Sequence, residues 1–257
     1  MCELMGMSAN VPTDVCFSFS GLMQRGGATG PHRDGWGIAF YEGKAVREFR
    51  DPNPSCDSPM AQFIQRYPIK SCTVISHIRQ ANVGDVCLEN THPFGRELWG
   101  RNWCFAHNGQ LPEVTDLPLE NYVPVGTTDS EYAFCWLLGQ VRKYFPEPPQ
   151  DPFMLWQFLK TCAERLLKLG VCNLLISDAE YLYAFCATQL HVITRCAPFG
   201  QAQLQDTELC IDFGLHAQPK DVVTVVATQP LTENETWQAL SRGEFLVLKA
   251  GETVSLL

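Results

Sequence analysis

The sequence predicts an α+β fold in which β-sheets pack face to face and helices cover the outside. Short apolar runs typical of strands fill both ends of the chain, and two longer segments with helical spacing lie in the middle, separated by Pro146–Pro152. Stacked layers bury one face of every such element. A chain of 257 residues is long enough for one large domain, and we expect residues 1–257 to form a single one.

The N-terminal part is expected to hold five strands and one helix. ELMGM (3–7) predicts a short first strand, and the hairpin WGIAFY–KAVREF (36–49) turns at Glu42-Gly43. CTVISHI (72–78) and NWCFAHN (102–108) predict two further strands. A helix after the first strand has Thr13 as its expected cap. Its apolar face carries Val15, Phe19, Leu22 and Met23.

The two central helices are marked by their ends. Thr128 and Glu131 form a capping box at the start of the first, and Gly170 closes the second, which is expected over 153–169. The first helix carries the apolar residues Tyr132, Trp136, Leu137, Val141 and Tyr144. After the second helix, antiparallel strands are expected at CNLLISD (172–178), YLYAFCA (181–187), LHVITR (190–195), VVTVVA (222–227) and FLVLK (245–249).

Composition argues against several classes of protein. The net charge is −9 without a run of Lys and Arg, which disfavours nucleic acid as a partner. No apolar run approaches the roughly 18 residues of a membrane span, and the N-terminus lacks the basic region of a secretory signal. The twelve cysteines include no CxxC pair, so we expect no metal site and mostly reduced, buried thiols in a cytoplasmic protein.

Cys2 raises the main chemical question. If Met1 is removed, this residue carries a thiol and a free α-amino group, and an amine with a pKa of roughly 7.7–8.0 can act as the base for that thiol. No histidine is then required for nucleophilic catalysis. Four stretches place special residues at the ends of predicted strands or at a helix start, where loops carry chemistry. They are DGWGIAFY (34–41), SHIRQAN (76–82), FAHNGQL (105–111) and GTTDSE (126–131).

Together with Cys2, these stretches resemble the class II glutamine amidotransferases, which are N-terminal nucleophile hydrolases. The resemblance implies a four-layer αββα sandwich of two mainly antiparallel sheets with helices outside. It also implies Cys2 as the nucleophile and Arg79 as the residue that binds the glutamine α-carboxylate. Asn108 and Gly109 match the oxyanion hole, whose donors stabilise the tetrahedral intermediate, and Asp129 matches the residue that binds the α-amino group.

Two further positions are expected to contact the substrate, Asn82 and Trp36. The chain has RQANVG where synthases of the family usually carry RWATHG, so Asn82 and Val83 replace a Thr and a His. DGWG and the later ATQPLTENETW (227–237) resemble single-domain members. The glycine-rich stretch 26–30 lacks the GK[ST] ending of a phosphate loop and is read as a mobile loop near the site.

Structural roles remain open for each of these residues. Arg79 can be a salt-bridge partner, Asp129 can complement the dipole of its helix, and Asn108-Gly109 can form a simple turn. Trp36 can lie in the core instead of the pocket, and His77 and His92 are interpreted as structural.

Three functions follow from the resemblance. The first is a glutamine amidotransferase or glutaminase domain without a fused synthase domain, whose ammonia goes to a separate synthase subunit or to solvent. The second is a hydrolase of another γ-glutamyl amide or peptide. The third is a non-catalytic regulatory or binding protein that retains the fold. No cofactor or metal is expected for any of them.

Overall fold

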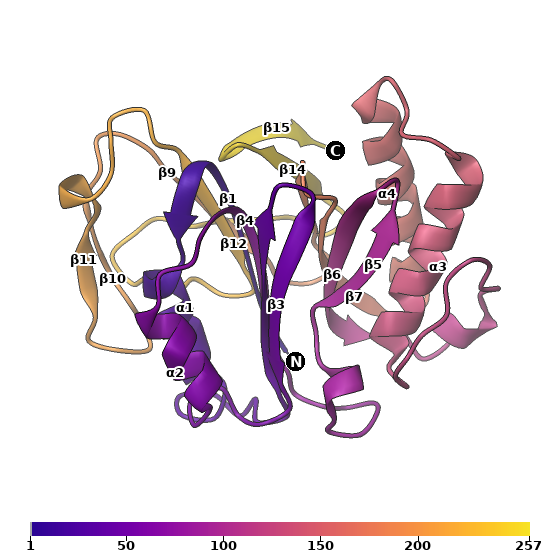
Figure 1. Ribbon diagram of the computed structural model, residues 1–257, viewed down its shortest axis with the longest axis horizontal. Coiled ribbons are helices and arrows are strands. Elements are labelled where there is room, and N and C mark those ends of the chain that lie inside the picture. Colours follow the sequence, from indigo (N-terminus) through magenta and orange to yellow (C-terminus); the bar gives the residue numbers. More distant parts are fainter. Residues whose placement is uncertain (1) are drawn as a thin grey trace.

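The computed structural model describes residues 2–257, which form two large antiparallel sheets, a small two-stranded sheet and four α-helices (Figure 1). The first large sheet has the strand order β13 (Gln238–Ala239), β9 (His191–Arg195), β12 (Val223–Ala227), β1 (Glu3–Asp14), β4 (Lys70–Ile78), β2 (Trp36–Glu42) and β3 (Ala45–Asp51). The second has the order β15 (Glu252–Leu256), β14 (Phe245–Lys249), β8 (Leu182–Phe185), β7 (Val171–Ser177), β6 (Arg101–Gln110) and β5 (Phe94–Leu98).

The remaining elements lie around these sheets. Strands β10 (Gln201–Gln203) and β11 (Cys210–Asp212) form the small hairpin. The helices are α1 (Cys16–Gln24), α2 (Pro59–Arg66), α3 (Asp129–Tyr144) and α4 (Pro152–Leu167). Short 3₁₀ turns cover Leu88–Asn90, Val114–Asp116 and Phe213–Leu215.

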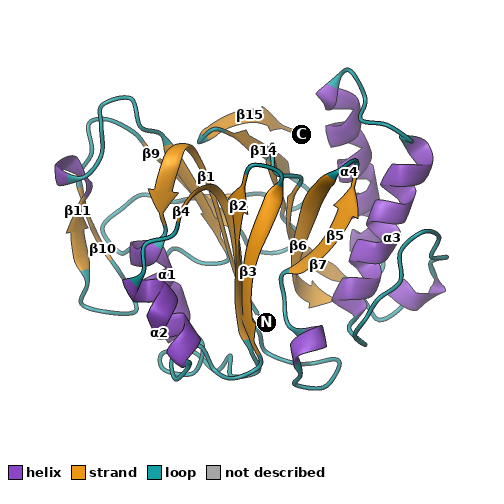
Figure 2. Cartoon of the chain, in the orientation of Figure 1, coloured by secondary structure: helices purple, strands orange, loops and turns teal. Residues whose placement is uncertain are grey.

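Four layers follow from three separate hydrophobic clusters. One cluster lies between the two sheets and includes Leu4, Ile75 and Leu175. A second packs α1 and α2 on the outer face of the first sheet, and a third packs α3 and α4 on the outer face of the second (Figure 2). Each sheet is therefore buried on both faces. This confirms the predicted α+β sandwich of two antiparallel sheets with helices outside.

Strand β1 shows how the alternation of a strand divides the layers. Its side chains alternate between faces, as in any strand. Leu4 belongs to the cluster between the sheets, while Met5 and Met7 belong to the cluster beneath α1. By this alternation, the side chain of Cys2 lies on the same face as that of Leu4, and the side chain of Glu3 lies on the same face as that of Met5. The thiol of Cys2 and the carboxyl group of Glu3 are thus directed to opposite faces of the same sheet.

The start of the first helix differs from the prediction. Strand β1 runs to Asp14, well beyond the predicted end at residue 7, and Thr13 is part of it. The cap of α1 is Val15, which makes no side-chain capping bond, so the prediction of Thr13 was wrong. The hydroxyl of Thr13 donates instead to the carbonyl of Val11 (2.9 Å), and Asp14 Oδ1 accepts from the N–H of Cys16 (3.2 Å).

The predicted capping box of α3 is half present. Thr128 Oγ1 accepts a hydrogen bond from the N–H of Glu131 (3.2 Å), as expected for the cap. The Glu131 carboxylate does not return to the Thr128 N–H. It accepts from the N–H of Gly126 (2.7 Å) and pairs with Arg96, which anchors the loop before α3 to strand β5.

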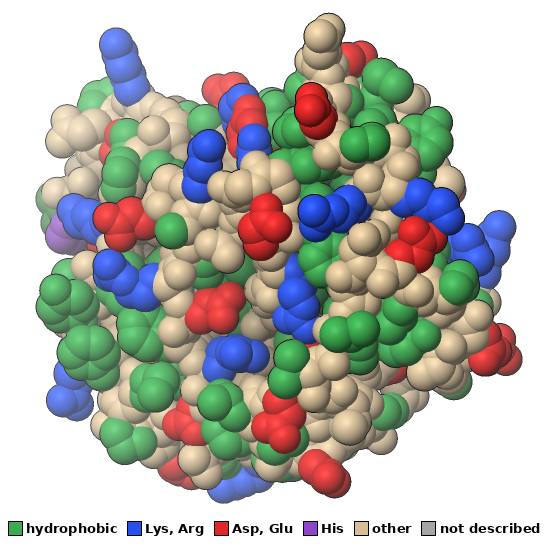
Figure 3. Space-filling view, turned by 45° about the vertical axis from the view of Figure 1, so that its right-hand side comes forward, with side chains coloured by type: hydrophobic (Ala, Val, Ile, Leu, Met, Phe, Trp, Pro, Cys, Tyr) green, Lys and Arg blue, Asp and Glu red, His purple; other side chains and the backbone are tan. Residues whose placement is uncertain are grey.

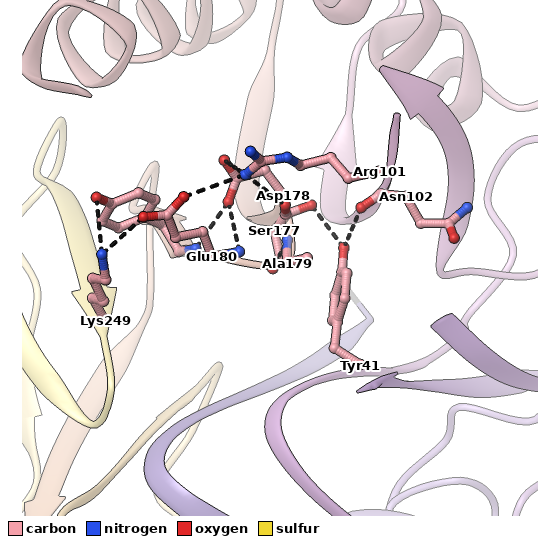
Figure 4. Close-up of polar contacts among 9 residues, drawn as sticks. Tyr41, Arg101, Asn102, Ser177, Asp178, Ala179, Glu180 and Lys249 are labelled. Carbon is pink, nitrogen blue, oxygen red and sulfur yellow. Dashed lines mark hydrogen bonds and ion pairs between the residues drawn. The ribbon is translucent and has the colours of Figure 1, made fainter. Parts of the chain in front are cut away.

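A polar network joins the two sheets far from Cys2 (Figure 4). Trp36 pairs with Ile78 next to Glu3, and Tyr41 lies five residues further along β2, about 17 Å away. The Tyr41 hydroxyl lies 2.8 Å from the carbonyl oxygen of Ser177 and 3.2 Å from that of Asn102, both in the second sheet. This cross-sheet contact fixes the distance between the layers at the end opposite the N-terminus.

The surface and the cysteines complete the description. Acidic and basic side chains are interspersed on the face shown in Figure 3, which presents no continuous basic patch. Among residues 2–257, no helix is long and apolar enough to cross a membrane. All twelve cysteines are free, and five of them are buried: Cys104, Cys135, Cys162, Cys172 and Cys186.

Candidate active site

The candidate site lies where strand β1 begins and strands β4 and β6 end. Glu3 pairs with Ile78, so the chain that follows β4 passes directly beside Cys2. The second sheet approaches from the other side, because Nε2 of His77 lies 3.2 Å from the carbonyl oxygen of His107 on β6. The ends of three strands from two sheets therefore meet at the N-terminus of the chain.

The thiol of Cys2 is held by the backbone of Gln80. The Gln80 N–H donates to Sγ (3.3 Å), and Sγ lies 3.4 Å from the Gln80 carbonyl oxygen. Burial raises the pKa of the Cys2 thiol, while the Gln80 N–H and the charge of Arg79 oppose that rise. The thiol is thus mostly protonated at neutral pH and needs a base to react.

A small cavity of about 30 Å³ joins most of the predicted residues. Cys2, Arg79, Asn82, Gly109 and Asp129 all line it. Its other walls are Gln80, Ala81, Val83, His92, His107, Gln110, Thr128 and Ser130. The volume is enough for about one water molecule. Among residues 2–257, no group of three or more His, Cys, Asp or Glu side chains is placed to hold a metal ion.

Arg79 is buried and turned onto the loop that follows it. Its Nη2 donates to the carbonyls of Val83 (3.0 Å) and Gly84 (3.1 Å), and its Nη1 to that of Asp85 (3.0 Å). The carbonyl of Asp34 lies 3.5 Å from Nη1. Both terminal nitrogens of Arg79 are therefore occupied by backbone carbonyls of the described chain.

Asp129 occupies the first position of α3 and combines two roles. Its Oδ2 accepts from the N–H of Leu111 (2.7 Å), which ties α3 to the end of β6. Its Oδ1 accepts from the N–H of Ser130 (2.8 Å), as a carboxylate at a helix N-terminus does. Asp129 also lines the cavity beside Cys2.

Asn108 and Gly109 lie on strand β6 rather than in a turn. Asn108 is fully buried, and one of the two N–H groups of its Nδ2 donates a hydrogen bond to Thr228 Oγ1 (3.4 Å). Oδ1 of Asn108 has no hydrogen-bond partner among the described residues. At Gly109 a Cβ atom would lie 1.8 Å from the carbonyl oxygen of Val171, so β7 passes too close for any other residue.

Trp36 lies in the core, one of the two alternatives for this residue. Its side chain is fully buried beneath α1, with its ring centroid 5.7 Å from that of Phe19. It does not line the cavity beside Cys2. Asn82 does line it and is exposed at its edge.

Thr228 is a site residue to which sequence reasoning gave no role. Its Oγ1 accepts from the N–H of Leu4 (2.9 Å) as well as from Asn108, and its own N–H donates to the Leu4 carbonyl (3.1 Å). It therefore links the residue that follows Glu3 to the side chain of Asn108. The ATQPLTENETW stretch contains it and was the available signal.

Three buried histidines form the back of the site. The ring centroids of His77 and His92 lie 4.1 Å apart with the rings tilted by 31°, and His107 Nδ1 lies 2.8 Å from Ser130 Oγ. Burial lowers the pKa of all three, to about 3 for His77. His107 Nε2 faces the carbonyl oxygen of Val171 (3.0 Å), which assigns its proton to that nitrogen. These rings are therefore neutral near pH 7.

A larger pocket of about 420 Å³ adjoins the small cavity. The two share Val83, Gln110, Thr128 and Asp129. Its further walls are mainly apolar or uncharged: Leu111, Pro112, Val114, Thr115, Pro124, Gly126, Thr127 and Tyr132. The site thus opens on the Asp129 side into a space large enough for a group beyond a single amino acid.

Comparisons with known proteins agree on one family. The family model "Glutamine amidotransferases class-II" matches residues 1–257. The chain is 59% identical to "Putative glutamine amidotransferase YafJ" of Escherichia coli K12, over 99% of this chain and 100% of that protein. It is 44% identical to a protein of Haemophilus influenzae that carries the name "Putative glutamine amidotransferase", over 99% of this chain and 86% of that protein.

Solved structures show the same fold. A crystal structure titled as a "predicted glutamine amidotransferase" from Pseudomonas aeruginosa matches with a TM-score of 0.78 at 54% identity, covering 99% of this chain and 100% of that one. The glutamine phosphoribosylpyrophosphate amidotransferase of Bacillus subtilis matches with a TM-score of 0.63 at 15% identity, covering 100% of this chain and 49% of that one. At that identity the second match concerns the fold alone.

Proposed function

Because this chain belongs to the class II glutamine amidotransferases, we propose that it hydrolyses the side-chain amide of glutamine through a thioester at Cys2. The observation that carries the proposal is the shared cavity of Cys2, Arg79, Gly109 and Asp129. A thiol, an oxyanion site and opposite charges for the two ends of an amino acid are the groups that this reaction needs.

The chemistry begins with removal of Met1, which frees the α-amino group of Cys2. That amine takes the thiol proton, and Sγ forms a bond to the Cδ carbon of glutamine. The negative charge on the amide oxygen is met by Nδ2 of Asn108 and the N–H of Gly109. The C–N bond then breaks, and ammonia leaves with the proton returned by the amine. A water molecule attacks the thioester, which releases glutamate and restores the thiol.

The ends of the substrate are assigned by charge. Asp129 pairs with the α-ammonium group, and Arg79 takes the α-carboxylate in exchange for carbonyls of the loop 83–85. In this proposal Asn82, which is exposed at the edge of the cavity, also contacts the substrate. Trp36 has no part in this proposal, because it lies in the core.

The released ammonia goes to a separate synthase subunit or to solvent. Residues 1–257 act in this proposal as a single glutaminase domain. Each of the three hydrophobic clusters contains residues from both halves of the described chain. Free thiols throughout the described chain fit a reducing compartment, and we place the reaction in the cytoplasm.

A second candidate is a hydrolase of a larger γ-glutamyl amide or peptide. The observation that favours it is the 420 Å³ pocket beside the 30 Å³ cavity. The attack on the γ-carbonyl carbon is the same, and only the substrate differs in size. Screening γ-glutamyl amides and dipeptides against free glutamine for product release separates this candidate from the first.

The test is labelling by 6-diazo-5-oxo-L-norleucine, a reactive glutamine analogue, followed by intact mass and peptide mapping. The wild-type protein is expected to lack Met1 and to gain one adduct at Cys2. The Cys2→Ala variant is expected to gain none. A Cys56→Ala variant is the matched control, because Cys56 is also partly buried, and it should label like wild type. A processed chain that stays unlabelled at Cys2 would contradict glutamine as the substrate.

A further inference from the structure

A buried cluster of three charged residues lies behind Cys2, on the opposite face of its sheet. It consists of Glu3 on β1, Arg25 at the C-terminal cap of α1, and Asp206 in the loop between β10 and β11. Their side chains are 6%, 7% and 13% exposed, respectively. These residues come from three parts of the chain that Figure 1 shows around α1.

Every guanidinium nitrogen of Arg25 has a hydrogen-bond partner. Nη1 donates to Glu3 Oε2 (3.0 Å), and Nε donates to Asp206 Oδ2 (2.8 Å). Nη2 donates to the carbonyl of Pro230 (2.6 Å), and Nη1 reaches that of Gln229 at 3.3 Å. Arg25 thus connects the first residue of β1 with the segment that follows β12.

Asp206 anchors this connection from the outside. Its second oxygen, Oδ1, accepts from the hydroxyl of Thr29 (2.7 Å), which lies in the glycine-rich stretch 26–30. The carboxylate therefore holds both the side chain of Arg25 and the loop that follows Arg25. This bond ties the stretch 26–30 to the cluster, while the N–H of Cys56 donates to the Gly26 carbonyl (3.3 Å) and ties the stretch to the segment before α2.

Stability alone does not explain such an arrangement. Removing charges from water is costly, and buried ion pairs can often be replaced by apolar residues without loss of stability. The cluster also sets two carboxylates against one guanidinium, with the buried His32 close enough to help Arg25 lower the pKa of Glu3. What it does supply is a fixed geometry, because Arg25 is held in a rigid fork by four partners.

We propose that Arg25 is a positioning residue for the Cys2 nucleophile, acting through Glu3 from the far face of the sheet and anchored there by Asp206. Glu3 is the residue next to Cys2, and its backbone pairs with that of Ile78 on β4. Fixing its side chain fixes the peptide that joins it to Cys2, and hence the place of the thiol and of the α-amino group. The inference rests on the proposed role of Cys2 as nucleophile.

Electrostatics supports this link between the two faces. Burial raises the pKa of Glu3, and the charge of Arg25 opposes that rise. The charge of Glu3 in turn adds to the burial that raises the pKa of Cys2. Arg25 thus keeps Glu3 ionised in a buried place, and its own positive charge offsets the effect of that carboxylate on the thiol.

The test compares Arg25→Lys, Glu3→Gln and Asp206→Asn with Asp178→Asn as the matched control. Asp178 is likewise a buried carboxylate beside an arginine, Arg101, but it lies in the network at the other end of the sandwich (Figure 4). The measurements are kcat and KM for glutamine, and the pH dependence of Cys2 alkylation by iodoacetamide, followed by peptide mapping.

In Arg25→Lys and Asp206→Asn we expect kcat to fall about 10-fold or more with KM changed less than about 2-fold, since displacement of a reacting group costs rate rather than binding. Glu3→Gln should lower the pH midpoint of Cys2 alkylation by about 0.5 pH unit, less than a direct charge contact produces, because it removes the carboxylate charge that raises the pKa of the thiol. Arg25→Lys keeps a positive charge beside Glu3, so its effect is expected in kcat. Asp178→Asn should change neither kcat nor the midpoint.

Two results would overturn the inference. One is a loss of thermal stability in the cluster variants with kcat and the alkylation midpoint unchanged, which would make the cluster purely structural. The other is an equal effect from Asp178→Asn. If no form of the protein releases ammonia from glutamine, the alkylation midpoints still decide the matter, because iodoacetamide needs no substrate site. In that event the alkylation midpoints alone test the positioning role of the cluster, and the missing ammonia release refutes only glutamine as the substrate.

Discussion

Thr228 Oγ1 lies 3.4 Å from Nδ2 of Asn108, and so joins the two sheets at the point where the proposed oxyanion would form. Asn108 belongs to the second sheet, while the chain before Thr228 is strand β12 of the first. The hydroxyl also accepts from the N–H of Leu4 (2.9 Å). One side chain thus sets the place of Asn108, the proposed oxyanion donor, relative to the strand that follows Cys2.

Replacing Thr228 by Val should disturb both partners at once. The N–H of Leu4 and one N–H of Asn108 lose their acceptor in a buried place, which we expect to cost about 1–3 kcal/mol of stability. Glutaminase kcat should fall about 10-fold or more, because a misplaced oxyanion donor loses part of its effect. Thr228→Ser keeps the hydroxyl and should restore both quantities. Denaturant unfolding and steady-state ammonia release measure them, and a Ser variant as impaired as the Val variant would contradict this role.

Gly109→Ala tests the close approach of β6 and β7. The added Cβ would lie 1.8 Å from the Val171 carbonyl oxygen, so the strands must separate. We expect a loss of about 3 kcal/mol or more, in the range of severe core substitutions, together with loss of activity. Gly200→Ala is the control, because nothing lies within 4 Å of a Cβ there. Unfolding midpoints in urea for the two variants should differ widely; similar midpoints would refute the argument.

The buried histidines predict a loss of stability in mild acid. The pKa of His77 is about 3 in the folded protein, below its ordinary value of about 6.5, so the unfolded chain binds more protons between these values. The stabilising contribution of the neutral ring is complete above about pH 6.5 and is lost as the pH falls toward 3. One such group changes the free energy of unfolding by about 1.4 kcal/mol per pH unit in that window.

A His77→Gln variant isolates this contribution. The variant lacks the titrating ring, so its stability should depend less steeply on pH than that of wild type. The difference in unfolding free energy between the two proteins should shrink as the pH is lowered from 7 to 5. Urea unfolding at several pH values measures it, and a difference that is constant over this range would show that His77 does not titrate as described.

Tyr41→Phe separates the fold from the site. The hydroxyl lies 2.8 Å from the carbonyl oxygen of Ser177 at the end of the sandwich far from Cys2. Its removal should lower stability by about 1 kcal/mol, the usual net value of such a bond. Labelling of Cys2 and ammonia release, measured well below the unfolding temperature, should match wild type. Reduced labelling in a folded variant would show that the two ends of the sandwich are coupled.

Local patterns were sufficient to predict most of the elements and the layered α+β class. The capping bond from Glu131 N–H to Thr128, the hairpin of β2 and β3 and the strand 72–78 depend on neighbours in sequence, which a pattern contains. The hairpin turns at Gly43-Lys44, one residue later than predicted. The cap of α1 was wrong because β1 continues through Thr13, held by pairing with Ser71 on β4. That pairing crosses more than fifty residues and leaves no local sign.

In the candidate site, too, local motifs could be predicted from the sequence and long-range contacts could not. Motifs indicated Cys2, Arg79, Gly109 and Asp129, and the structure brings these four to one cavity. The roles proposed for them stay predictions. Missing from the sequence reading were the partners that act across distance: Thr228, Gln80 beside the thiol, and the cluster of Arg25 behind it. Each makes its contact through a hydroxyl, a backbone group or a buried charge whose partner is fixed only by the folded chain.

The central position of β1 has a consequence for biosynthesis. Its neighbours in the sheet are β4 and β12, and the N–H of Leu4 bonds to a residue 224 positions later. A ribosome releases the N-terminus first, yet the strand cannot gain its second neighbour until nearly all of the described chain has emerged. Strand β1 therefore lacks one neighbour for most of translation, and the proposed nucleophile site around Cys2 is assembled only when synthesis is almost complete.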